Sequence, residues 1–197
     1  QSLSSALISL PRDPLLHYYL GTTYYRLNQY PAAIRHLNLS IRFDQSYMNA
    51  YQNLGLLYKK IRNYPMAENT YFKGLAINEN SHDLNFNLGR LYELQNKLPL
   101  ALLFLKKAFS LKATDHIYSY QVAQIYIKMS QWDKALEFLK TTLSLNPEYA
   151  PAQYNLGWIY EKHKNSPVLA RYHYRFFLEL EPNSPYRKRI QYFLNSR

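Results

Sequence analysis

Residues 51–58 read YQNLGLLY, and this short stretch decides how the chain is organised. Tyr51, Leu54, Gly55 and Tyr58 are spaced i, i+3, i+4 and i+7, which places them on one side of an α-helix. A glycine in such a stripe costs the helix roughly 0.5–1 kcal/mol relative to alanine. Its presence therefore indicates a steric need, and we expect a second helix to approach closely at this point.

The same stretch returns every 34 residues. Tyrosine stands at positions 24, 58, 92, 126 and 160, and three residues before it stand Gly21, Gly55, Gly89, Ala123 and Gly157. A small residue follows each tyrosine by nine or ten positions: Ala33, Ala67, Ala101, Ala135 and Ala170. A fixed period of this size is typical of stacked repeats, in which each repeat buries its apolar face against its neighbours. We expect all five tyrosines to be buried.

A second helix is predicted in each repeat. A short polar turn, for example KIRNYP at 60–65, follows the tyrosine. Prolines then stand where the first turn of a helix tolerates the missing N–H: Pro31, Pro65, Pro99 and Pro167. We expect Ala67, on the second helix, to face Gly55.

The motif resembles the tetratricopeptide repeat family: a Leu-Gly pair, a tyrosine three residues after the glycine, a small residue further on, and a proline near the repeat's end in Pro147 and Pro182. The resemblance implies an all-α fold, a right-handed superhelical solenoid of antiparallel helix pairs. The tryptophan that often opens the family's motif is replaced, so we expect a looser first contact at His17, Tyr51, Asn85, Ser119 and Gln153.

The domain boundaries follow from this register. Five repeats are predicted at 14–47, 48–81, 82–115, 116–149 and 150–184. Residues 185–197 are expected to form a capping helix, with Ser184 as N-cap, Pro185 opening the helix, and Ile190, Phe193 and Leu194 on one face. Residues 1–13 are expected to be the second helix and end of a truncated preceding repeat, which indicates a fragment of a longer protein.

Composition argues against several functional classes. The chain has no cysteine, so disulfides and thiolate metal sites are excluded. Its six histidines form no ligand motif, and no nucleophile elbow or phosphate loop occurs, so we predict no catalytic residue, no metal, no cofactor and no enzyme activity. No apolar run is long enough to cross a membrane. The cytoplasm is favoured as the location, and an extracytoplasmic one stays open.

The first helices carry the candidate binding site. A primary amide stands at one phase in four consecutive repeats: Asn53, Asn87, Gln121 and Asn155. In the tetratricopeptide family this phase lines the concave groove, and the row resembles the asparagine ladder of the O-linked GlcNAc transferase superhelix. An amide both donates and accepts hydrogen bonds, so it suits peptide main chain. The other candidate peptide-binding residues on these helices are Tyr18, Gln52, Phe86, Arg90, Tyr120, Gln124, Lys128, Tyr154, Trp158 and Lys162.

Rings at helical spacing are also common in packing, so Tyr18, Phe86, Tyr120 and Tyr154 have that second interpretation. Trp158 is the stronger candidate, as an exposed anchor.

The predicted function is a non-catalytic protein-interaction scaffold that binds an extended peptide segment. Lysine and arginine number 24 against 13 acidic residues, a net charge of +11, which favours an acidic partner. Hsp70 and Hsp90 tails are disfavoured, because the positions of the family's carboxylate clamp hold residues such as Asn49, Asp83 and Asn87.

Four alternatives stay open. The chain could be an electrostatic binder of nucleic acid, which the spread of its basic residues disfavours, or of an anionic membrane surface. It could be the repeat region of a larger enzyme or assembly factor. It could also associate with itself through Leu3, Leu7 and Ile8 of the truncated first helix.

Overall fold

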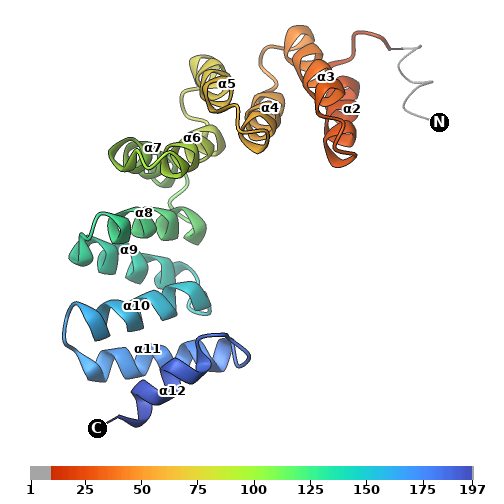
Figure 1. Ribbon diagram of the computed structural model, residues 1–197. Coiled ribbons are helices and arrows are strands. Elements are labelled where there is room, and N and C mark those ends of the chain that lie inside the picture. Colours follow the sequence, from red (N-terminus) through yellow and green to blue (C-terminus); the bar gives the residue numbers. More distant parts are fainter. Residues whose placement is uncertain (1–9, 197) are drawn as a thin grey trace. The chain divides into compact units, whose positions relative to one another are not determined.

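The computed structural model describes residues 10–196, and within this range every regular element is an α-helix (Figure 1). The first helices of the repeats are α2 (Pro14–Arg26), α4 (Met48–Lys60), α6 (His82–Leu94), α8 (His116–Lys128) and α10 (Ala150–Lys162). The second helices are α3 (Tyr30–Phe43), α5 (Tyr64–Ile77), α7 (Leu98–Leu111), α9 (Trp132–Leu145) and α11 (Pro167–Leu180), and α12 (Arg187–Asn195) follows. The predicted all-α repeat fold is confirmed.

The predictions for a helix before residue 10 and for self-association through Leu3, Leu7 and Ile8 lie outside the described residues.

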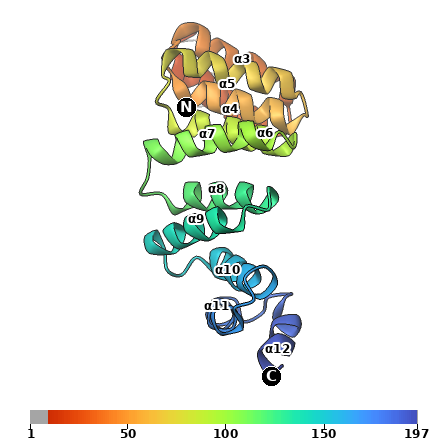
Figure 2. The same ribbon diagram turned by 90° about the vertical axis from the view of Figure 1, so that its left-hand side faces the viewer.

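The chain divides into two compact units between Leu111 and Lys112. Unit 1 contains α2–α7, and unit 2 contains α8–α12. Within each unit the two helices of a repeat pack together, and each second helix also contacts the first helix that follows it, as α3 contacts α4 and α9 contacts α10 (Figure 2). Each repeat therefore buries its apolar stripe against its own partner helix and its neighbour, as expected for a solenoid.

The turn between the paired helices has a repeated backbone geometry. One residue of each turn adopts a left-handed conformation, with φ between 44° and 60°: Asn28, Arg62, Asn96, Ser130 and Asn165. The next N–H donates to the carbonyl of the periodic tyrosine, as Gln29 does to Tyr24 at 2.9 Å. This is the hydrogen-bond pattern of a Schellman motif, which satisfies carbonyls at a helix end. Asparagine tolerates the conformation well and arginine or serine less so.

The periodic tyrosines are buried in four repeats out of five. Tyr58, Tyr92, Tyr126 and Tyr160 expose between 4% and 8% of their surface. Tyr24 is only partly buried, and its ring stacks on His36 with a centroid distance of 5.3 Å. The expectation of a core position is therefore wrong for Tyr24.

The glycines lie at close helix contacts, but their partner is not the predicted alanine. A Cβ placed on Gly55 would meet three atoms of the Tyr71 ring at 2.2–2.7 Å. The corresponding partner of Gly21 is Leu37, and that of Gly157 is Tyr174. Ala67 is fully buried, yet none of the atoms nearest to Gly55 belongs to it. The glycine therefore makes room for a large side chain of the second helix.

The positions of the missing tryptophan are not loosely packed. All five replacements are buried, with exposed fractions from 0% to 5%. In three repeats the side chain at this position lies within hydrogen-bond distance of the carbonyl oxygen six residues earlier: His17 with Pro11 at 3.1 Å, Asn85 with Glu79 at 3.2 Å and Gln153 with Pro147 at 3.1 Å. A buried polar side chain is tolerated when it is hydrogen-bonded. These side chains therefore fasten the loop between repeats to the helix that follows.

The polar side chain at this position also reaches its partner helix. His17 and His36 bring their Nδ1 atoms to 2.9 Å, and His173 Nδ1 lies 2.8 Å from Gln153 Oε1. Because an amide oxygen only accepts, His173 must carry its proton on Nδ1. Burial, with a smaller contribution from the charge of Lys140, lowers the pKa of His173 to about 4 from 6.5.

We therefore expect unit 2 to lose stability as the pH falls from 6.5 to about 4. In this window the unfolded chain binds a proton at His173 that the folded chain does not, so the free energy of unfolding decreases with decreasing pH. The check is the thermal midpoint at pH 7 and pH 5 for the chain and for His173→Phe, which places the residue of Phe104 and Phe138 at the same helix position. The variant should show a smaller fall, and an equal fall in both proteins would contradict the account.

The last repeat is covered by α12. Ile190 is fully buried in a cluster with Ala150, Tyr174 and Phe177, against which Phe193 and Leu194 pack. The helix begins at Arg187, and not at Pro185 as the sequence predicts. Ser184 Oγ accepts a hydrogen bond from the Tyr186 N–H, and this bond holds residues 184–186 in a turn before the helix.

An ionic network fastens α12 to the last repeat. Arg189 donates to Glu161 Oε2 at 2.6 Å and to the Tyr174 hydroxyl at 3.1 Å, and Tyr174 donates to the same carboxylate oxygen at 2.7 Å. Burial alone would raise the pKa of Glu161, but the hydrogen bonds from Lys162 and Tyr174 and the charge of Arg189 lower it overall. Glu161 is therefore charged in the folded chain at neutral pH.

Candidate functional site

The two outer members of the predicted row of amides pair with tyrosines. Asn53 Nδ2 donates to the Tyr18 hydroxyl at 3.0 Å, and Asn155 Nδ2 donates to the Tyr120 hydroxyl at 3.2 Å. In both pairs the amide of one repeat bonds the tyrosine of the preceding repeat. The amide keeps its oxygen and one N–H for a ligand, and the tyrosine keeps its O–H as a donor.

Tyr120 is neutral at ordinary pH, because burial, followed by the neighbouring Tyr149, raises its pKa to about 12.

The two middle members of the row differ from these pairs. Asn87 exposes only 7% of its surface, and Gln121 is partly buried. The flanking Gln52 and Phe86 are partly buried as well. Gln124 is partly buried, and the structure gives its buried Nε2 no hydrogen-bond partner among the described residues. The four amides of the row therefore differ in their exposure to a ligand.

A first pocket lies in unit 1 and has a volume of about 460 Å³. It contains the Tyr18–Asn53 pair, and its full lining is Tyr18, Tyr19, Thr22, Thr23, Tyr25, Arg26, Leu37, Asn53 and Leu56. All but Leu37 come from the first helices α2 and α4. Thr22 and Thr23 both donate their hydroxyl hydrogens to the Tyr19 carbonyl, which leaves their oxygens as acceptors. Arg26 is the one charged side chain in this lining.

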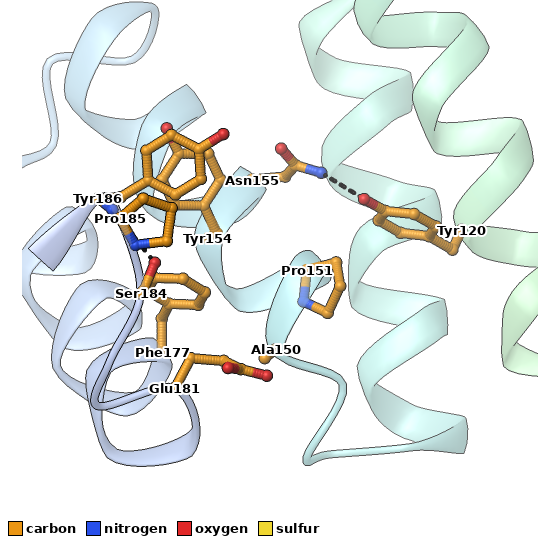
Figure 3. Close-up of a pocket in the computed structure, with 10 residues that line it drawn as sticks. All are labelled: Tyr120, Ala150, Pro151, Tyr154, Asn155, Phe177, Glu181, Ser184, Pro185 and Tyr186. Atoms are coloured by element: carbon orange, nitrogen blue, oxygen red, sulfur yellow. Dashed lines mark hydrogen bonds between the residues drawn. The ribbon is translucent and has the colours of Figure 1, made fainter.

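A second pocket lies in unit 2 and has a volume of about 370 Å³ (Figure 3). It contains the Tyr120–Asn155 pair and Tyr154, which the sequence predicts as binding residues. The remaining lining residues are Ala150, Pro151, Phe177, Glu181, Ser184, Pro185 and Tyr186. The sequence does not predict this second group as binding residues. The proline-containing segment EPNSPY at 181–186, at the end of the last repeat, is the signal that could have marked it.

Trp158 is not the exposed anchor that the sequence predicts. It is partly buried, and its ring meets Trp132 edge-on at 5.7 Å and His163 at 4.8 Å. Trp132 in turn stacks on His163 at 3.7 Å. Trp158 thus takes part in the packing of α9 against α10, and it does not line the unit 2 pocket.

The predicted basic residues are dispersed. Arg90 pairs with Glu93 at 2.6 Å, and Lys162 pairs with Glu161 at 2.7 Å. Lys128 is exposed on α8. None of the three lines either pocket that contains an Asn–Tyr pair.

Among the described residues no group of three or more His, Asp or Glu side chains could hold a metal ion. No helix in residues 10–196 is long and apolar enough to cross a membrane.

Comparison with known families settles the fold family. A TPR repeat family matches residues 21–61, and two tetratricopeptide repeat families match residues 50–82 and 120–185. The chain is a tetratricopeptide-repeat protein. No curated protein matches the sequence of this tetratricopeptide-repeat protein.

Solved structures share the same fold. YrrB, described as a TPR protein with an unusual peptide-binding site, is 20% identical with a TM-score of 0.75, over 98% of both chains. MamA from Desulfovibrio magneticus RS-1 is 19% identical with a TM-score of 0.75, over 87% of this chain and 97% of MamA. PilF from Pseudomonas aeruginosa is 14% identical with a TM-score of 0.80, over 96% of this chain and 86% of PilF. At these identities the similarity establishes the fold.

Proposed function

We propose that this tetratricopeptide-repeat protein is a non-catalytic interaction scaffold that binds an extended peptide segment of a partner protein along its first helices. The observation that carries the proposal is that each unit has a pocket built around the same Asn–Tyr pair. Tyr18 and Asn53 line one pocket, and Tyr120 and Asn155 line the other. The two pairs occupy equivalent repeat positions, which supports a recurring contact, whereas the rest of each lining differs.

The chemistry of the pairs suits a peptide main chain. Each pair offers an amide oxygen as an acceptor and a tyrosine O–H as a donor, next to apolar rings. Each hydrogen bond to main chain would contribute about 0.5–1.5 kcal/mol net. Two pairs together with apolar contacts would support micromolar affinity, about −8 kcal/mol.

Two of the strongly perturbed titratable groups, His173 and Tyr92, serve helix packing, whereas a third, Tyr120, lines the unit 2 pocket as a neutral hydroxyl. Perturbed pKa values often mark active sites. Here His173 bonds Gln153 between two helices, and Tyr92, whose pKa is raised to about 12 by burial and by its hydrogen bond to Glu68, donates to that carboxylate at 2.9 Å. Both groups thus serve helix packing.

The bound segment is proposed to carry an acidic residue opposite unit 1. Arg26 lines the unit 1 pocket together with three tyrosines, and its guanidinium would hold a carboxylate. The net charge of +11 would attract such a segment at long range.

Selection of random linear peptides on the full chain, followed by titration against salt, tests the proposal. We expect peptides to be enriched and their affinity to fall only mildly between about 50 and 200 mM salt, whereas an electrostatic binder of nucleic acid would lose about 10³-fold or more. Failure to enrich any peptide, together with steeply salt-dependent binding of single-stranded DNA or of anionic vesicles, would contradict the proposal.

A further inference from the structure

The unit 2 pocket is walled mainly by aromatic rings. Tyr154 stacks on Tyr186 with a centroid distance of 4.6 Å and an interplanar angle of 26°, and it meets Phe177 at 5.3 Å. Tyr120 stands on another side of the pocket, held by Asn155 (Figure 3). Aromatic rings carry negative charge on their faces, so a pocket of this kind attracts cations.

Glu181 adds a formal negative charge to the same pocket. It follows the last residue of α11, and in Figure 3 its carboxylate points from there toward Ala150 at the start of α10. No described residue forms an ion pair with it or donates a hydrogen bond to its side chain. The other carboxylate close to α12, Glu161, has Arg189, Lys162 and Tyr174 as partners. Of these two carboxylates, Glu181 is the one without a partner among the described residues, and it can therefore bind a ligand.

Two cations of α12 lie near the pocket without lining it: Arg187 donates to the Pro182 carbonyl, and Arg189 acts on the Tyr154 side chain. The Arg189 guanidinium lies 5.6 Å from the centre of the Tyr174 ring and donates to Glu161. Arg189 is absent from the pocket lining, and Glu181 is the only charged side chain in it.

We infer that the unit 2 pocket binds a basic side chain, arginine in preference to lysine, of the segment that the scaffold holds; the inference rests on the proposed function. In Figure 3 Glu181 and Asn155 lie at opposite ends of the pocket, so one guanidinium group does not bridge them. Because it is planar and carries five N–H groups, a guanidinium can instead stack on an aromatic wall of the pocket while it donates to Glu181. Lysine can satisfy the carboxylate but not this combination. At about 370 Å³ the pocket is at the small end of ligand sites, which suits one side chain.

The inference gives the two pockets opposite charge preferences. The Arg26 pocket of unit 1 is proposed to hold an acidic residue and the Glu181 pocket of unit 2 a basic one. The two pockets are tested separately, since each lies within one unit.

Amino-acid derivatives test the pocket without any knowledge of the partner. The full chain, labelled with ¹⁵N, is titrated with N-acetylarginine methylamide, while the side-chain amide signal of Asn155 is followed by NMR. N-acetylcitrulline methylamide, which has nearly the same shape and no charge, is the matched control. We expect millimolar binding of the arginine derivative and about five-fold weaker binding of the citrulline derivative, since a cation on aromatic faces gains this much.

Two pairs of variants locate the effect. Glu181→Gln should weaken the arginine derivative about three-fold, as loss of an exposed ion pair does. Glu179→Gln makes the same change two residues away on α11, outside this pocket, and should leave the affinity unchanged. Tyr186→Phe keeps the ring and should retain binding, whereas Tyr186→Leu should lose most of it.

Equal binding of the arginine and citrulline derivatives, or equal weakening by Glu181→Gln and Glu179→Gln, would overturn the inference. Tighter binding of N-acetylproline methylamide would also overturn it and make this an apolar proline pocket. These results are independent of the peptide selection: arginine binding without any enriched peptide would contradict the proposed function alone, and enriched peptides without charge discrimination would contradict the pocket assignment alone.

Discussion

Replacing Gly55 with alanine is expected to destabilise unit 1 by about 1–3 kcal/mol, although alanine is the better helix former. The new methyl group would lie 2.2 Å from Cε1 of Tyr71, which is fully buried and cannot swing into solvent. The two helices of the second repeat would have to separate, and their shared core would open. Chemical denaturation followed by far-UV circular dichroism measures the loss.

The repeats themselves provide the rescue variant. In the fourth repeat Ala123 takes the place of the glycine, and Leu139 takes the place of Tyr71. Gly55→Ala combined with Tyr71→Leu reproduces that pair and should recover most of the lost stability. Gly89→Ala is the matched control, because its methyl group would meet the Leu105 side chain first, at 2.7 Å, and leucine adjusts more easily than a ring. A Gly55→Ala chain as stable as the parent would contradict the role of close helix approach.

Truncating Ile190 to alanine is expected to destabilise unit 2 by about 2–4 kcal/mol. Ile190 is the one fully buried side chain of α12, and it fills the space between Tyr174 and Phe177. Its loss would leave a cavity under the helix and weaken the cover of the last repeat. Tyr192→Ala, on the same helix with 81% of its surface exposed, should change stability by less than about 0.5 kcal/mol.

Tryptophan fluorescence is the appropriate measurement for this pair. Both tryptophans of the chain, Trp132 and Trp158, lie in unit 2, so the signal reports the unfolding of that unit. Unfolding midpoints in urea that shift equally for Ile190→Ala and Tyr192→Ala would mean that α12 does not act as a cap.

The helix register could be predicted from the sequence because every repeat carries the same pattern of residues. The apolar spacing, the energetic cost of glycine and the prolines of the second helices all indicate one arrangement. The first helices of the repeats begin at intervals of 34 residues from Pro14 to Ala150. Local chemistry is sufficient here because a repeat contacts mainly its own partner helix and the next repeat.

The partners of individual side chains could not be predicted in the same way. The Asn53–Tyr18 bond joins residues 35 positions apart in different repeats, and it depends on how two first helices lie against each other. The sequence predicts Ala67 as the partner of Gly55 because a small residue facing a small residue is the simplest close approach. The packing instead places a large ring against Gly55, and only the second helix's rotation decides this.

The unit 2 pocket was missed for a related reason. Glu181 stands at the end of the fifth repeat, and Pro185 and Tyr186 follow it, outside the helices whose faces the 34-residue period predicts. The burial of Trp158 could not be predicted because its packing partners are Trp132, the first residue of α9, and His163, the C-cap residue of α10, and the spacing within one helix does not show that these two helix ends meet.

The affinity of one selected peptide for two variants tests the central claim most directly, namely that a partner is recognised by the Asn–Tyr pairs of the first helices. Asn53→Ala combined with Asn155→Ala should weaken binding about ten-fold, at roughly 0.7 kcal/mol for each amide, while helicity and melting stay the same. Asn38→Ala removes an exposed amide from the second helix α3, where it only bonds the Ile34 carbonyl, and should leave the affinity unchanged. Unchanged affinity in the double variant, or an equal loss in Asn38→Ala, would contradict the claim.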